Sequence, residues 1–146
     1  MKKFLLATLI LAGISLTGCG NIANSGTKPP TSIPIKIIIG EKTFDAILAD
    51  TPSSQALIEK FPLDIEMREF NGNEKYYTFD KNLPTRDTSV MLIRTGDIML
   101  WASNTVVIFY QDFQTMYNYT PLGKIMNTDG LIEAVGNGNI RVRFEK

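Results

Sequence analysis

The side chains that most often carry chemistry are scarce in this chain. Its 146 residues include one cysteine and no histidine, so the commonest general base and metal ligand is missing. The sequence contains no Ser-His-Asp set, no His-Glu-x-x-His and no glycine-rich phosphate loop. It therefore predicts no catalytic residue, no metal site and no cofactor. The groups left to consider are the thiol of Cys19 and a set of aromatic rings between residues 101 and 119.

Cys19 ends a segment with the properties of a secretion signal. Two lysines near the N-terminus precede an apolar run, residues 4–16, that is too short for a good transmembrane span. The run leads into Leu16-Thr17-Gly18-Cys19, which resembles the lipobox of bacterial lipoproteins, Leu-x-Gly-Cys. The resemblance implies that the Cys19 thiol receives a diacylglycerol, with acyl chains such as palmitate, and that residues 1–18 are removed as a signal peptide. The alternative is an ordinary signal peptide with an unrelated cysteine.

A lipid on Cys19 would hold the remaining chain outside the cytoplasm, at the cell membrane or an outer membrane. Residues 19–34 are small and polar with three prolines, which indicates a lipidated N-terminus and a flexible tether before a domain at 35–146. Loss of Lys2 and Lys3 leaves 13 basic against 15 acidic side chains, a net charge of −2. The acyl chains, and not basic residues, would therefore bind the membrane. With no basic stripe in the sequence, no nucleic-acid partner is expected.

The domain has the pattern of a succession of short strands. Apolar alternation and hairpin spacing predict strands over residues 35–39, 42–49, 63–70, 75–79, 98–101, 105–110, 119–126 and 139–144. The unbroken β-branched and aromatic run 105–110 indicates burial on both faces or a barrel wall. Asn71-Gly72 predicts a hairpin with Gly72 at positive φ in a type I′ turn. The stretches 80–95 and 111–118 are expected to be irregular.

Two short helices complete the prediction. The first covers residues 52–60, with Asp50 or Thr51 as its N-cap and a proline in its first turn. The second covers residues 130–135, with Asp129 as its N-cap. The chain therefore belongs to the all-β class, mainly strand with two short helices, in a closed barrel or a sandwich.

The order of these elements resembles that of the bacterial cyclophilin-like domains. The resemblance covers nearly all of residues 35–146 and rests on four stretches: 71–77 (NGNEKYY), 96–101 (GDIMLW), 106–110 (VVIFY) and 119–125 (YTPLGKI). It implies a closed eight-stranded β-barrel capped by short helices. True cyclophilins are peptidyl-prolyl isomerases. Their Phe-His-Arg segment is absent here, and no glutamine stands in residues 104–109, where their Gly-Ser-Gln-Phe-Phe strand would fall.

The leading interpretation is a module that binds a small ligand or peptide without catalysis. The candidates for its binding surface are Trp101, Tyr110, Tyr117 and Tyr119, because their rings offer rigid apolar area with a polar tip. Packing in the barrel core or under a loop is the alternative for each of these rings. Two other functions remain open, an isomerase-like enzyme and a purely structural component of the envelope. A pocket lined by the tyrosines favours binding, and a filled barrel without a cleft favours the structural role.

Overall fold

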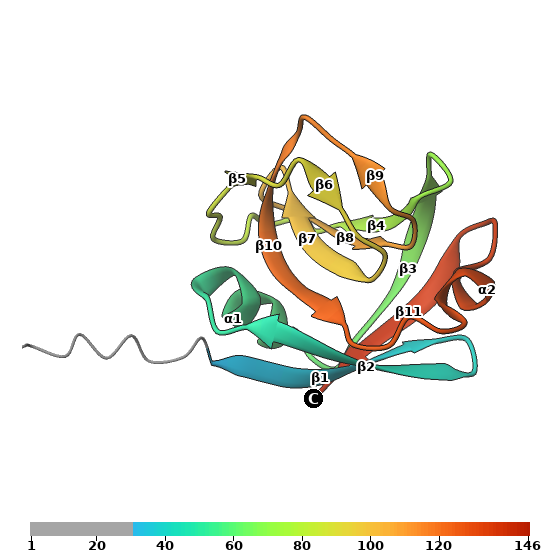
Figure 1. Cartoon of the computed structure of the whole chain (residues 1–146). Helices are drawn as coiled ribbons and strands as arrows, with labels where there is room; N and C mark the ends of the chain where they lie inside the picture. The colour runs from blue at the N-terminus through green and yellow to red at the C-terminus, as the bar shows by residue number, and fades with distance from the viewer. Residues whose placement is uncertain (1–30) are drawn as a thin grey trace, which may run out of the picture.

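The computed structural model describes residues 31–146, which fold around a closed antiparallel barrel of eight strands (Figure 1). Its strands are β1 (Ser32–Ile39), β2 (Lys42–Ala49), β3 (Leu63–Phe70), β4 (Glu74–Thr78), β7 (Asp97–Trp101), β8 (Thr105–Phe109), β10 (Asn118–Ile125) and β11 (Ile140–Glu145). Their order is β2-β1-β11-β3-β4-β8-β7-β10, and pairing of β10 with β2 closes the ring. The predicted fold, a closed eight-stranded barrel with two short helices, is confirmed. Cys19, the signal segment and the tether up to residue 30 lie outside the described residues.

Three strands of two residues each lie in the stretches predicted to be irregular. These are β5 (Thr88–Ser89), β6 (Leu92–Ile93) and β9 (Phe113–Gln114). β5 pairs with the start of β10, and β6 pairs with β9 in a small separate sheet. Two-residue strands are too short to show a period of two, so the sequence pattern could not reveal them. β1 also begins at Ser32, three residues before the predicted run, because its first residues pair with β2.

A glycine allows the barrel to close. Around residue 123, β10 pairs with β7 on one side and with β2 on the other, where Gly123 lies opposite Leu48. A Cβ on Gly123 would overlap the carbonyl oxygen of Ile47. The register against β7 shifts by one residue between Pro121 and Gly123, a bulge of the kind that bends a strand at a barrel corner.

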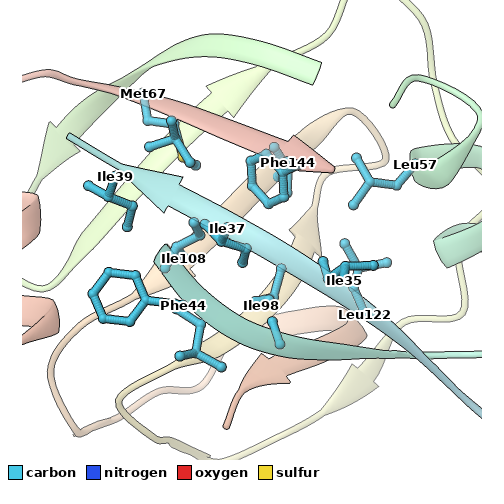
Figure 2. Packing of buried hydrophobic residues seen from close by; sticks show 14 of the residues in the cluster. Ile35, Ile37, Ile39, Phe44, Leu57, Met67, Ile98, Ile108, Leu122 and Phe144 are labelled. Atoms are coloured by element: carbon cyan, nitrogen blue, oxygen red, sulfur yellow. The ribbon is translucent and has the colours of Figure 1, made fainter. Parts of the chain in front are cut away.

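The barrel interior is filled by apolar side chains. Figure 2 shows five side chains converging from different strands: Ile37, Ile98, Ile108, Leu122 and Phe144. All five are fully buried. At native packing density such a core leaves no room for a ligand inside the barrel. None of the helices within residues 31–146 is long and apolar enough to cross a membrane.

The two helices pack on opposite sides of the barrel (Figure 1). α1 (Pro52–Ile58) is capped by Thr51, whose hydroxyl accepts from the Ser54 amide at 3.2 Å, as predicted, and Leu57 anchors it in the core. α2 (Leu131–Val135) departs from the prediction, because its N-cap is Gly130 and not Asp129. The chain reaches α2 through a left-handed residue, φ +76°, which suits glycine and leaves the Asp129 side chain outside the cap position.

The Asn71–Gly72 turn allows a direct stability test. Asn71 and Gly72 have φ of +53° and +68°, and the Asn73 amide donates to the Phe70 carbonyl, which confirms a type I′ turn. A Cβ on Gly72 would meet no atom within 4 Å, so Gly72→Val should cost only backbone strain, about 1–2 kcal/mol of unfolding free energy. Urea unfolding measures this loss. Gly138→Val is the matched control, since Gly138 has equal space without a positive φ, and equal losses in both variants would contradict the argument.

Candidate functional site

The four aromatic residues expected to bind a ligand do not meet around one pocket. Trp101, at the end of β7, is 47% exposed, and Tyr117, in the loop before β10, is 68% exposed. Tyr110 and Tyr119 are buried, on the inner and outer sides of the barrel wall respectively. Each of these two buried rings lies near an acidic side chain: Tyr110 near Glu69 and Tyr119 near Glu74.

Tyr110 belongs to a buried polar cluster that contains a lysine the sequence analysis did not single out. The Tyr110 hydroxyl lies 2.8 and 2.9 Å from the two carboxylate oxygens of Glu69. Glu69 also forms an ion pair with Lys75, whose side chain is fully buried. The Lys75 ammonium donates further to the carbonyls of Gly136 at 3.0 Å and Gly138 at 2.6 Å, and it lies 5.4 Å from the centre of the Tyr110 ring.

The hydrogen bonds of this cluster set the charge states of its members. Burial pulls the pKa of Glu69 upward, but the hydrogen bonds from Lys75, Tyr110 and the Gly72 amide outweigh it and hold that pKa below its usual range. Burial and the bond to Glu69 raise the pKa of Tyr110 to about 12. All these groups are paired with one another, so the cluster stabilises the barrel end next to α2 and does not offer a free base or nucleophile.

β8 forms the part of the wall that is buried on both faces, as its unbroken apolar run predicts. Val106 and Ile108 point into the barrel core, and Val107 and Phe109 face outward. The outward side chains are covered by Ile93 of β6 and by Phe113 of β9, whose ring centre lies 5.6 Å from that of Phe109. The small β6–β9 sheet thus occupies the outer face of this wall.

Tyr119 lies in this outer cluster, near an acidic side chain. Its ring meets that of Phe109 edge to face at 5.6 Å. Glu74, half-buried on β4, is the cross-strand partner of Phe109 on one side and of Phe70 on the other. Burial and the negative charge of Glu69 raise the pKa of Glu74 to about 7, and Glu74 together with burial raises that of Tyr119.

Two hollows lie along β3 on the outer surface, one toward β11 and one where β3 and β4 separate. β3 and β4 pair next to their hairpin, from Phe70–Glu74 to Arg68–Tyr76. Beyond these pairs the two strands diverge, as Figure 1 shows. Each hollow has a volume of about 390 Å³. The first is lined by Asp64, Ile65, Glu66, Asn139, Ile140 and Arg141, and the second by Glu66, Arg68, Tyr76, Tyr77, Thr78 and Asn139. The two hollows meet at Glu66 and Asn139. We call the second hollow, together with the adjoining stretch of β3 back to Asp64, the β3–β4 groove.

Backbone groups on both sides of the β3–β4 groove lack a strand partner. The Phe79 amide donates to the carbonyl of Asn104, next to β8. Successive residues of a strand direct their backbone groups to opposite sides, so those of Thr78 point toward β3. Arg68 and Phe70 pair with β4, so by the same alternation Asp64 and Glu66 also direct their backbone groups toward β4. No strand of the described residues pairs with Asp64, Glu66 or Thr78 across the groove.

The side chains along the groove are charged and mostly exposed. Arg141 binds Asp64 through two hydrogen bonds of 2.7 and 3.0 Å, and these hold the pKa of Asp64 below its usual range. Glu66 accepts only a long bond of 3.4 Å from Asn139, and Arg68 forms no ion pair within residues 31–146. The groove therefore presents one free charge of each sign beside open backbone edges. No three potential metal ligands gather in the described part of the chain.

Glu74→Gln is expected to make stability less sensitive to pH. The pKa of Glu74 is about 7 in the folded protein against an ordinary 4.5, so the folded state binds this proton more tightly. The free energy of unfolding should therefore fall as the pH rises from 4.5 to 7. The fall should be about 1–2 kcal/mol. This is less than the pKa shift alone would give, because solvent screens a half-exposed group. Urea unfolding at both ends of this range should show a smaller fall for the glutamine variant, and equal falls would contradict the assignment.

Comparison with known proteins agrees with this architecture. A search of curated proteins finds no match. Among solved structures, the chain is similar to the solution structure of the hypothetical protein AF2241 from Archaeoglobus fulgidus, with a TM-score of 0.54 and 14% identity over 82% of this chain and 98% of the other. At that identity the likeness concerns the fold alone. The model of the Cyclophilin-like family matches residues 37–145, nearly the whole described domain. The chain therefore belongs to the cyclophilin-like family.

Proposed function

We propose that this protein is an extracytoplasmic lipoprotein, anchored to a membrane through Cys19, whose barrel binds extended peptides without catalysis. The observation that carries the binding role is the β3–β4 groove, where Asp64, Glu66 and Thr78 present backbone groups without a strand partner. An extended peptide can add to such an edge as a strand, with main-chain hydrogen bonds for affinity and side-chain contacts for selectivity.

The groove limits the size and strength of the interaction. A peptide entering it would continue the ladder that β4 forms with Arg68 and Phe70, pairing with Glu66 and then Asp64. About four peptide residues would fit such a short edge, and small interfaces of this kind bind weakly, with a Kd on the order of 100 μM. Glu66 and Arg68 would select peptides that carry charges of both signs.

Two features support binding over isomerisation. The side chains along the groove include no activated nucleophile and no histidine. The wall residues Val106, Ile108 and Phe109, which lie where the Gly-Ser-Gln-Phe-Phe strand of true cyclophilins would fall, pack against the protein's own core and against the β6–β9 sheet. An apolar wall without polar groups would also bind ground and transition states alike, which gives affinity but not rate.

The sequence before the barrel supports the proposed anchor. Cys19 ends the lipobox-like stretch, and 12 residues separate it from Ser32, where β1 begins. Even fully extended, 12 residues span only about 40 Å. A lipid on Cys19 would thus keep the β3–β4 groove near the membrane surface, where it could meet peptide segments of other envelope proteins.

Replacement of Glu66 tests the peptide site. Peptides enriched from a random heptapeptide library on the Cys19→Ser protein would be measured by fluorescence anisotropy. Glu66→Pro removes the amide that should pair with the peptide, and proline is tolerated at a strand edge, so we expect affinity to fall at least tenfold with the fold intact. Glu66→Ala keeps the amide and removes only the charge, so it should lose clearly less affinity than the proline variant. Equal binding by the proline variant, or no enriched peptide, would contradict the proposal.

Replacement of Cys19 tests the anchor separately. Cys19→Ser removes the thiol that would accept the diacylglycerol, so the chain should stay folded but lose lipoprotein-type processing and membrane retention. Phase partitioning in detergent and the molecular mass of the purified chain provide the measurement. A serine variant that partitions into the detergent phase as the wild type does would contradict lipidation.

A further inference from the structure

Glu74 lies among four aromatic rings on the outer face of the barrel, away from the β3–β4 groove. Its cross-strand partners are Phe70 on β3 and Phe109 on β8, so all three side chains project from the same face. Tyr76 follows on that face two residues along β4, and its ring meets that of Phe70 edge to face at 6.1 Å. Tyr119 stands behind, edge to face with Phe109.

We infer that Glu74 and the two accessible rings, Phe70 and Tyr76, form a binding site for an organic ammonium group. The faces of aromatic rings are electron-rich and attract cations within about 6 Å of the ring centre. A carboxylate beside such rings adds a negative charge when it is ionised. The combination of aromatic rings and one acid is the arrangement that binds ammonium groups with apolar substituents.

The carboxylate of Glu74 lacks a partner within the protein. No described residue donates a hydrogen bond to it, and Lys75, its neighbour in the sequence, is engaged elsewhere. Lys75 points to the opposite side of β4, where it is held by Glu69 and two carbonyls. A half-buried carboxylate without a hydrogen bond is costly to maintain, and an external cation would satisfy it.

The exposure of the rings indicates what size of ligand can bind. Phe109 and Tyr119 are buried and pack behind Glu74, so a ligand contacts only Phe70, which is 50% exposed, and half-buried Tyr76. The ligand therefore inserts only its charged headgroup and leaves the rest of the molecule in solvent. A metal ion is disfavoured because one carboxylate supplies too few oxygen ligands, and the negative charge excludes anions.

This site meets the β3–β4 groove only at Tyr76, which lines the second hollow, and the inference does not depend on the proposed peptide binding. Glu66 and Thr78 of the groove lie beyond the Arg68–Tyr76 pair, whereas Glu74 lies at the hairpin end of the same strands. Loss of one site by mutation should leave the other intact, which lets the two be tested independently.

Titration of the full chain with tetramethylammonium chloride tests the inference. The protein would be held in a maltoside detergent at pH 8 and constant ionic strength, with NMR shifts of the Phe and Tyr rings as the readout. We expect saturable binding in the millimolar range that shifts the Phe70 and Tyr76 signals. Uncharged tert-butanol, which has nearly the same shape, should bind at least tenfold more weakly.

Three variants complete the experiment. Glu74→Gln should weaken tetramethylammonium binding at least tenfold, and Phe70→Leu should weaken it severalfold without changing the charge. Glu41→Gln, an exposed acid in the turn between β1 and β2, is the matched control and should bind as the wild type does. Absence of saturable binding, equal binding by Glu74→Gln, or equal binding of tert-butanol would overturn the inference.

Discussion

Closure of the barrel through the β2–β10 pair is the constraint on which the rest of the structure depends. β10 must leave the register of β7 and reach β2, and the bulge between Pro121 and Gly123 provides the bend. Gly123 provides the space, since a side chain there would collide with the Ile47 backbone. Once the ring is closed, the inward side chains of all eight strands face one another and fill the interior. The interior therefore has no room for a ligand, and only the outer surface is open to one.

The outer surface of the barrel is covered over β8 and open at β3 and β4. Over β8 the small β6–β9 sheet buries Val107 and Phe109, so this part of the wall is closed to ligands. At β3 and β4 no such cover exists within residues 31–146, and the two strands diverge after three residue pairs. The same hairpin thus carries an open backbone edge at its wide end and a carboxylate among aromatic rings at its narrow end. A fold with a filled interior can present two distinct surfaces on one pair of strands.

The sequence predicted the barrel well because its signals are local. Apolar alternation predicted the long strands, Asn71-Gly72 predicted the hairpin, and Thr51 with Pro52 predicted the start of the first helix. It could not predict which positions meet across the ring. Lys75 alternates like an ordinary strand residue, and its burial depends on Glu69 and on the distant carbonyls of Gly136 and Gly138. The exposed position of Trp101 and the grouping of Glu74 with Phe70 and Phe109 likewise depend on strand register, which single-sequence patterns do not determine.

The buried ammonium of Lys75 gives the molecule an internal reporter of its own opening. Reagents that acylate amines need a neutral, accessible nitrogen, and Lys75 has 0% of its surface exposed and is bound by Glu69 and two carbonyls. Lys81, in an exposed loop, has no such protection. The ratio of acylation rates at these two lysines would therefore measure how often the α2 end of the barrel separates from β4, without any added label.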